Sequence, residues 1–280
     1  MKVLVTGANG QLGSELRVIA SADYLFTDIA ELDICSEEAV AEFVERNSVD
    51  VIVNCAAYTN VDRAEEEENV AERVNSTAVA ILARVAKRKG ARLIHISTDY
   101  VFGGERFETP IVETAEPSPL GVYGRTKLLG ERAIEESGCK YAIIRTSWLY
   151  STYGKNFVKT ILHLASERDE LRVVSDQIGS PTYARDLAEV IVRICEREEF
   201  DSGLYHYSNR GEISWYDFAR AIVEIGGAEC RVVPCTTAEY GAKAPRPAYS
   251  VLDTSKICNA LRCEIPDWRV SLEECINKMS

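Results

Sequence analysis

The feature that most limits the fold of this chain is a glycine-rich turn near its N-terminus. A short apolar run from Val3 to Thr6 leads directly into Gly7-Ala8-Asn9-Gly10-Gln11-Leu12-Gly13. Apolar residues then recur with helical spacing up to Ile19. A strand that turns through glycines into a helix brings backbone N–H groups and the positive end of the helix dipole to one point, where a pyrophosphate can bind. The spacing is GxxGxxG, a sister of the GxGxxG fingerprint.

Further strands and helices alternate through the first half of the chain. Strands are predicted at 24–27, 49–57, 92–97 and 141–145, and helices from Ser36, from Asp62 to Lys89, and from Tyr123 to Glu136. This alternation predicts an α/β fold with a Rossmann-type doubly wound parallel sheet. The second half is less regular, and amphipathic helices are expected near 155–167, 184–197 and 214–225.

The composition argues against several classes of function. With 44 acidic and 32 basic residues, the formal net charge is −12, which repels nucleic acid and anionic membranes. No apolar run reaches the length of about 18 residues that a membrane span needs, and the N-terminus does not resemble a signal peptide. The nine cysteines contain no CxxC pair. We therefore expect reduced thiols, a cytoplasmic location and no metal site.

An acidic residue at the end of the second strand indicates which ligand the glycine turn receives. Asp28 is placed to accept hydrogen bonds from the hydroxyls of an adenosine ribose. A glycine turn without this partner would be as compatible with an ordinary strand-to-helix connection. No Arg or Lys lies between Asp28 and Asp33, so a 2′-phosphate has no obvious partner. The sequence thus predicts NADH or NADPH as cofactor, with a weak preference for NADH.

A second pattern carries proton chemistry. Tyr123 and Lys127 are four residues apart and share one helix face. A free tyrosine has a pKa near 10, and a nearby ammonium is expected to lower it and ready the hydroxyl for proton transfer. So short a pattern also arises by chance. Thr98 strengthens it, because it follows the strand at 92–97, at the carboxyl edge where such sheets bind ligands.

These residues, in this order, resemble the extended short-chain dehydrogenase/reductase superfamily, and within it the reductases of dTDP-linked 4-keto-sugars. The similarity covers nearly the whole chain and lies in the stretches 7–13, 53–62, 97–102, 122–124, 145–148, 176–182, 203–206 and 246–247. It implies a Rossmann-type domain at 1–150 plus about 182–207. A smaller C-terminal substrate-binding lobe would comprise about 151–181 and 208–280.

The resemblance also implies roles for individual residues. The cofactor would be lined by Gly7, Gly10, Gln11, Leu12, Gly13, Asp28, Asp33, Ile34, Ala57, Tyr58, Thr59, Tyr123 and Lys127. The sugar would be faced by Thr98, Asp99, Tyr100 and Trp148. Cys55 and Tyr58 depart from the alanine and histidine of relatives, which leaves the chemistry intact. Glu15 matches one member of an acidic cluster that binds magnesium in some relatives, but no other member is found here.

The implied reaction is reduction at C4 of dTDP-4-keto-6-deoxy-L-mannose. Tyr123 would act as the general acid, Thr98 would hydrogen-bond the carbonyl oxygen, and Lys127 would stabilise the phenolate and hold the nicotinamide ribose. The protein would be a monomer or a homodimer. One alternative is another epimerase or reductase of sugar nucleotides. Related dehydratases carry Asp-Glu after the threonine, whereas Asp99 is followed here by Tyr100. The other alternative is a non-catalytic regulatory subunit, which would not need Thr98, Tyr123 and Lys127 together.

Overall fold

A parallel sheet of six strands forms the centre of the computed structural model, which describes residues 1–105 and 107–279. The strand order is β10-β5-β4-β3-β1-β2, and every neighbouring pair is parallel. The strands are β1 (Val3–Thr6), β2 (Tyr24–Thr27), β3 (Val51–Asn54), β4 (Arg92–Thr98), β5 (Lys140–Thr146) and β10 (Gly203–His206). The order reverses between β1 and β3, and ligands bind at the carboxyl ends of strands beside such a reversal.

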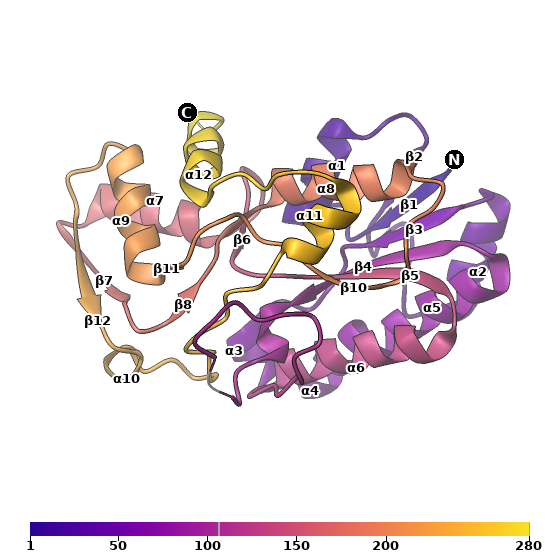
Figure 1. Cartoon of the computed structure of the whole chain (residues 1–280), viewed down its shortest axis with the longest axis horizontal. Coiled ribbons are helices and arrows are strands. Elements are labelled where there is room, and N and C mark those ends of the chain that lie inside the picture. Colours follow the sequence, from indigo (N-terminus) through magenta and orange to yellow (C-terminus); the bar gives the residue numbers. More distant parts are fainter. Residues whose placement is uncertain (106, 280) are drawn as a thin grey trace.

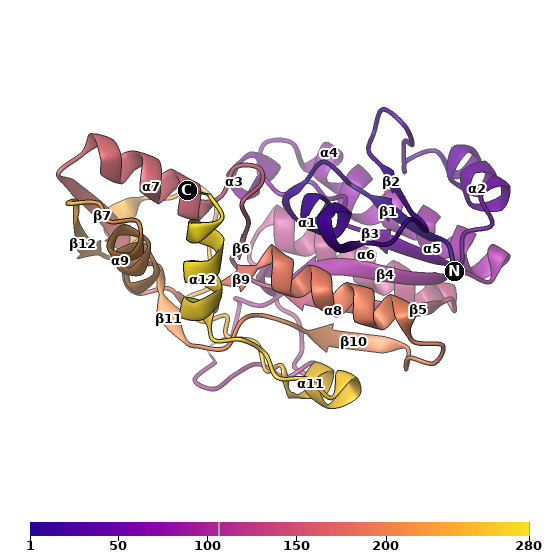
Figure 2. The same ribbon diagram turned by 90° about the horizontal axis from the view of Figure 1, so that it is seen from above.

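Helices cover both faces of this sheet, which confirms the predicted doubly wound α/β fold (Figures 1 and 2). One face packs against α1 (Gln11–Ile19), α8 (Ala184–Glu196) and α11 (Ser255–Leu261). The other packs against α2 (Glu37–Arg46), α5 (Ala78–Lys89) and α6 (Val122–Ser137). Successive strand residues point to opposite faces: Val3 and Val5 enter the first core and Leu4 enters the second. Burial on both faces explains the continuous apolar runs of these strands.

A second group of elements lies at the other end of the molecule, at the left of Figure 1. Its own apolar core contains residues of α7 (Phe157–Glu167), α9 (Trp215–Ile225), α12 (Trp268–Asn277) and β7 (Glu170–Val174). Strand β7 pairs with β12 (Arg231–Cys235), and shorter pairs join β6 (Leu149–Tyr150) to β9 (Thr182–Tyr183) and β8 (Ile178–Gly179) to β11 (Ile213–Ser214). The short helix α10 spans Thr237–Tyr240. The predicted division of the chain into two domains at 150, 182 and 207 stays a prediction.

One predicted helix is wrong. Instead of a single helix from 62 to 89, the structure has α3 (Val61–Ala64), α4 (Glu68–Glu72), a π-helical turn (Arg73–Thr77) and then α5. The helix is interrupted at 65–67, and an asparagine on each side of this interruption bonds the backbone. Asn60 caps α3 by accepting from the backbone N–H of Arg63 at 3.1 Å. Asn75 turns inward and bonds the backbone of Tyr58 in both directions, at 2.9 and 3.0 Å. The helices expected near 155–167, 184–197 and 214–225 are confirmed as α7, α8 and α9.

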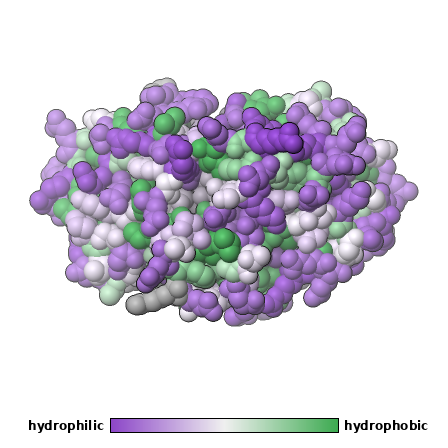
Figure 3. Space-filling model, in the orientation of Figure 1, coloured by the Kyte–Doolittle hydropathy of each residue, from purple (hydrophilic) through white to green (hydrophobic). Residues whose placement is uncertain are grey.

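The surface is consistent with an acidic, well-solvated protein. Hydrophilic side chains cover most of the face shown in Figure 3, and hydrophobic residues appear there as small patches. Across residues 1–105 and 107–279, no helix has the length and hydropathy that a membrane crossing requires.

Candidate active site

Two cavities lie at the carboxyl ends of the central strands. The larger has a volume of about 550 Å³ and the smaller about 330 Å³. Both are lined by Gly7, Gly10, Cys55 and Ala57, so they meet over the ends of β1 and β3. Together they form an elongated cleft at the reversal of the strand order, where the sheet topology predicts a ligand.

The glycine turn brings bare backbone to the wall of this cleft. Gly7 has φ +66°, and a Cβ there would lie 2.5 Å from the backbone nitrogen of Ala56. At Gly13 a Cβ would lie 2.5 Å from the carbonyl oxygen of Gly7, so glycine is required for α1 to pack against the turn. Gly10 caps α1 without a side-chain hydrogen bond. The first N–H groups of α1 therefore remain available to an anion, as a pyrophosphate site needs.

Asp28 lies in the smaller cavity with Asp33 and Ile34. Its carboxylate accepts from the backbone N–H groups of Asn9 and Ile29, both at 2.9 Å, which hold it beside the glycine turn. A carboxylate has about four lone-pair sites, so two remain for ribose hydroxyls. Gln11 lines the larger cavity, and its Oε1 is buried without a hydrogen-bond partner in the described part of the chain. Both residues offer acceptors that a dinucleotide can use.

The cleft brings together most of the predicted cofactor and substrate residues. The larger cavity is lined by Gly7, Gly10, Gln11, Leu12, Gly13, Ala57, Thr59, Thr98, Asp99, Tyr100, Tyr123, Lys127 and Trp148. The smaller adds Asp28, Asp33 and Ile34. Tyr58 lines neither cavity. Its hydroxyl donates to Glu67 at 2.6 Å, and its ring packs beside Tyr123 in a small apolar cluster.

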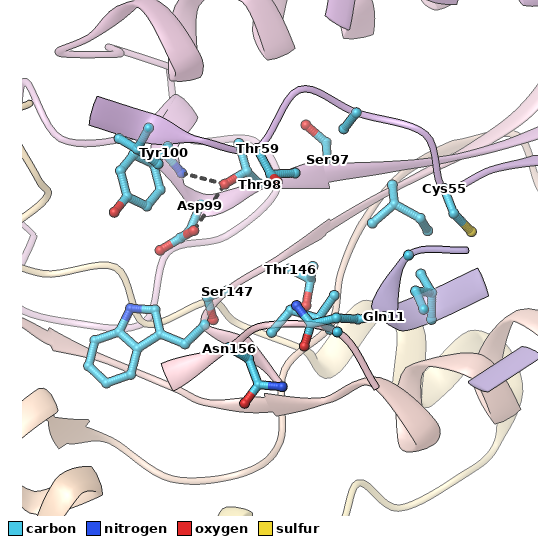
Figure 4. A pocket seen from close by; sticks show the side chains of 18 of the residues that line it. Gln11, Cys55, Thr59, Ser97, Thr98, Asp99, Tyr100, Thr146, Ser147 and Asn156 are labelled. Atoms are coloured by element: carbon cyan, nitrogen blue, oxygen red, sulfur yellow. Dashed lines mark hydrogen bonds between the residues drawn. The ribbon is translucent and has the colours of Figure 1, made fainter. Parts of the chain in front are cut away.

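Thr98 and its neighbours form the polar end of the cavity. The Thr98 hydroxyl accepts from the backbone N–H of Tyr100 at 3.2 Å and donates to Asp99 Oδ1 at 3.1 Å. Figure 4 shows Thr98, Asp99 and Tyr100 on one side of the cavity, and Ser147, Asn156 and Gln11 on the other. A substrate between these two sides can therefore be held by hydrogen bonds from both.

Tyr123 reaches this end from the start of α6. Glu65 accepts from the backbone N–H of Val122 at 2.8 Å and so fixes the first turn of the helix. The Tyr123 ring lies edge to face with Tyr100, 5.4 Å between centroids. A Cβ at Gly124 would lie 2.1 Å from the carbonyl oxygen of Tyr100, so only glycine lets the helix approach this closely.

The acid–base properties of Tyr123 differ from the sequence expectation. Burial raises the pKa of Tyr123 to about 12, although a hydrogen bond with Thr98 opposes the rise. The Lys127 ammonium donates elsewhere, to the carbonyl oxygen of Ile96 at 2.7 Å. The expectation of a lowered Tyr123 pKa is therefore wrong for this structure, because burial outweighs any effect of the Lys127 charge. A tyrosine in this state keeps its proton at neutral pH and is suited to donate it.

Lys127 is buried, with an exposed fraction of 1 %. Burial lowers the pKa of Lys127 to about 8, and the negative charge of Glu131 opposes this. Glu131 forms a bidentate ion pair with Arg145, at 2.9 and 2.6 Å, and accepts a hydrogen bond from Ser97. Ser97 and Lys127 line the cavity, and the Glu131–Arg145 pair is buried against Ser97, so these side chains position the strand and helix that carry Thr98 and Lys127.

An aromatic wall closes the other end of the cavity. Trp148 has φ +47° and stacks on Trp215, 3.7 Å between centroids and 13° between planes. Gly179 leaves room for the stack, since a Cβ there would lie 2.7 Å from the Trp148 ring. Trp215 and Phe157 also line a neighbouring cavity of about 660 Å³ that contains Arg246. Trp215 and Phe157 were not predicted from the sequence, because residues on amphipathic helices give no local signal of facing a ligand.

Comparison with known proteins places the chain in a family. The family described as RmlD substrate binding domain matches residues 1–280. This chain belongs to that family. It is 42% identical to the dTDP-4-dehydrorhamnose reductase of Burkholderia thailandensis, with 100% of this chain and 99% of the relative covered. It is 44% identical to the spore coat polysaccharide biosynthesis protein SpsK of Bacillus subtilis, with 100% and 98% covered. A crystal structure of the reductase of Bacillus anthracis in complex with NADP has a TM-score of 0.94 and 40% identity, with 99% and 100% covered.

Glu15 is held by polar contacts inside the fold. It is buried in α1, where it accepts from the Ser151 hydroxyl at 2.6 Å and lies 3.8 Å from the Arg185 guanidinium. In the residues that the structure describes, no group of three or more His, Cys, Asp or Glu side chains has the arrangement of a metal site. The partners of Glu15 are those of a structural carboxylate.

Burial of the Asp99 carboxylate is unfavourable for folding when the carboxylate is charged. Its exposed fraction is 2 %, and Oδ2 has no hydrogen-bond partner within the described residues. Burial raises the pKa of Asp99 to about 6, with hydrogen bonds to the carboxylate opposing this in part. The native state therefore binds the proton more tightly than the unfolded chain. The contribution of Asp99 to stability is fully present below about pH 4. It is lost as the pH rises through about 6, the pKa of Asp99 in the folded state.

We expect Asp99→Asn to stabilise the protein by roughly 1–3 kcal/mol at neutral pH while it impairs catalysis, because the amide removes a buried charge. Urea unfolding at neutral pH and at about pH 4 measures the effect, and the gain should shrink at the lower pH. Asp33→Asn, at a half-exposed carboxylate of the same cleft, is the control. Destabilisation by Asp99→Asn at neutral pH would show that the charge is compensated.

Proposed function

We propose that this chain is a dTDP-4-dehydrorhamnose reductase, which uses NADH or NADPH to reduce C4 of dTDP-4-keto-6-deoxy-L-mannose to dTDP-L-rhamnose. The family and the names of the full-length relatives support the reaction. The observation that carries it is that Thr98, Tyr123 and Lys127 line one cavity together with the glycine turn.

The cleft fits a nicotinamide dinucleotide. The bare backbone of the glycine turn and the uncapped start of α1 would hold the pyrophosphate, and Asp28 would hold the adenosine ribose. Lys127, which lines the larger cavity, would hold the nicotinamide ribose. The chemistry that this cofactor supplies is hydride donation to the substrate carbonyl carbon.

The side chains of this protein handle the proton. Tyr123 donates its phenolic proton to the carbonyl oxygen as negative charge develops there, and the positive charge of Lys127 stabilises the phenolate that remains. In this structure the Thr98 hydroxyl donates to Asp99, so Thr98 turns to the carbonyl oxygen only when Asp99 accepts from the sugar instead. Asp99 Oδ2 is the free acceptor that a sugar hydroxyl can use.

We also propose that the protein prefers NADH to NADPH. Asp28 and Asp33 line the cavity at the adenosine end, and their negative charge opposes a 2′-phosphate. We expect Asp28→Asn to lower kcat/KM with NADH and raise it with NADPH, so that the ratio changes about tenfold, or ~1.4 kcal/mol. The amide oxygen still accepts from Asn9, so the turn is preserved.

Steady-state assays with both cofactors measure this ratio. Glu31→Gln is the matched control, because it removes a neighbouring charge that does not line the cavity and keeps an acceptor for the Asp28 N–H. An unchanged ratio in Asp28→Asn would refute the role of Asp28 in cofactor choice.

The reaction itself is tested by mixing the protein with dTDP-4-keto-6-deoxy-L-mannose and each reduced cofactor while following the cofactor absorbance. We expect oxidation of the cofactor and one dTDP-L-rhamnose formed for each molecule oxidised. If the cofactor binds but is not oxidised, the proposal fails, and an epimerase or a regulatory subunit on this fold becomes the better account.

A further inference from the structure

A row of buried polar side chains connects Thr6 of β1 to Lys127. Its second member is Asn54, whose side-chain amide has a fixed orientation. Asn54 Oδ1 accepts from the Thr6 hydroxyl at 2.7 Å and from the backbone N–H of Ala56 at 3.2 Å. A backbone N–H can only donate, so the oxygen of the Asn54 amide must face Ala56. The Asn54 NH₂ group therefore points the other way, towards β4.

The next member is His95, in the middle of β4 and fully buried. Asn54 Nδ2 lies 3.0 Å from His95 Nδ1. Because Nδ2 is a donor, Nδ1 must be the acceptor and carries no proton. Burial holds the pKa of His95 well below its usual value, and the nearby charge of Lys127 acts in the same direction, so the ring is neutral. A neutral ring with a bare Nδ1 carries its proton on Nε2.

That Nε2–H faces Lys127. The distance from His95 Nε2 to Lys127 Nζ is 3.2 Å, and Nζ also donates to the Ile96 carbonyl at 2.7 Å. An ammonium has no lone pair, so two donors meet when Lys127 is charged. A neutral amine accepts from Nε2–H, donates one proton to Ile96 and keeps one for the cavity. The Nε2–H of His95 then has an acceptor.

Two other titratable groups act on Lys127 from the packed elements. Glu131 lies one turn further along α6, and its charge is shared with Arg145; Cys55 follows β3. Both favour the ammonium, whereas burial and the Nε2–H of His95 favour the amine. The hydrogen bonds in the row thus favour the neutral amine of Lys127, whereas the charge of Glu131 favours the ammonium.

We propose that His95 is a positioning residue for Lys127: held as its Nε2–H tautomer by Asn54, it fixes the lysine under the cavity and favours the neutral amine. The role in catalysis rests on the proposed reductase function, in which the ammonium form stabilises the Tyr123 phenolate. The hydrogen bonds of this row then determine the pH above which activity falls, although no substrate contacts His95. Reversing the direction of these hydrogen bonds moves that pH upwards.

The tautomer is tested without substrate, cofactor or activity. The full-length protein is labelled with ¹⁵N-histidine and studied by NMR across about pH 5 to 8, where histidines ordinarily titrate. The chain has only three histidines, so the variants His163→Asn and His206→Asn assign the other two signals. We expect His95 to remain neutral with its proton on Nε2. A proton on Nδ1, or an imidazolium in this range, overturns the proposal whatever the protein catalyses.

Asn54→Asp reverses the row. The carboxylate accepts from Nδ1–H, so the His95 proton moves to Nδ1 and the bare Nε2 accepts from the Lys127 ammonium. We expect the alkaline limb of the kcat/KM profile to move up by about one pH unit, together with the change of tautomer. Asn75→Asp is the matched control, because it adds a carboxylate beside α6 without contact to His95. A limb that moves while the tautomer stays, or that moves equally in the control, shows an effect of charge alone and refutes the proposal.

Discussion

Replacement of Tyr123 by phenylalanine is expected to lower kcat about 10²- to 10⁴-fold, the usual contribution of a positioned general acid. The change removes only the hydroxyl, so the apolar packing of the ring beside Tyr58 and Val122 is kept. Tyr123 lines the same cavity as Thr98, and burial raises its pKa to about 12, so it holds its proton at neutral pH. The barrier to protonation of the developing alkoxide should therefore rise with little change in stability.

Reductase assays measure kcat, and fluorescence titration with NADH measures cofactor binding, which should change little. Tyr100→Phe is the matched control, since Tyr100 lines the same cavity and packs edge to face with Tyr123. We expect this control to keep most of kcat. An equal loss in both variants would mean that the hydroxyls act through solvation of the cavity, and that Tyr123 is not the acid.

The largest effect on stability is expected from Arg145→Met. Arg145 and Glu131 form a bidentate ion pair, and the side chain of each is 3% exposed. Removal of the guanidinium leaves Glu131 buried with the Ser97 hydroxyl as its remaining hydrogen-bond donor in the described chain. Breaking one side of a buried pair typically costs about 3–5 kcal/mol, because the remaining charge is uncompensated.

Urea unfolding of Arg145→Met gives the free energy of unfolding directly. The double variant Arg145→Met/Glu131→Leu removes both charges and should recover most of the loss. Arg84→Met is the control: its pair with Glu37 is exposed and screened by water, so the loss should be far smaller. A loss as small as in the control would contradict the claim that this pair is desolvated.

The parallel sheet was predictable because its strands and helices are specified locally. The strands at 3–6 and 24–27 were predicted to the residue, since each apolar run ends at a glycine or an aspartate. Ser36 caps α2 by accepting from the backbone N–H of Ala39 at 3.3 Å, as its position before Glu37 and Glu38 suggested. Local periodicity and capping carry this information in the chain itself.

What the sequence left open depends on contacts between distant residues. Asn75 bonds Tyr58 from a π-helical turn within the helix predicted at 62–89, and helical spacing does not reveal that pairing. His95 is read only as a strand residue until the fold brings it to Lys127, 32 residues away. The pKa of Tyr123 was misjudged because burial outweighs any neighbouring charge, and burial is set by tertiary packing.

Strand β10 is the last strand of the central sheet to be synthesised, which leaves the sheet incomplete in the nascent chain. This strand completes the sheet beside β5, and α8 covers the core that contains Val5 and Ile144. Until residue 206 has left the ribosome, β5 presents an open edge, which is the usual template for aggregation. We expect the nascent chain to be prone to aggregation over this interval, and a fragment that stops at Tyr150 to have the same open edge.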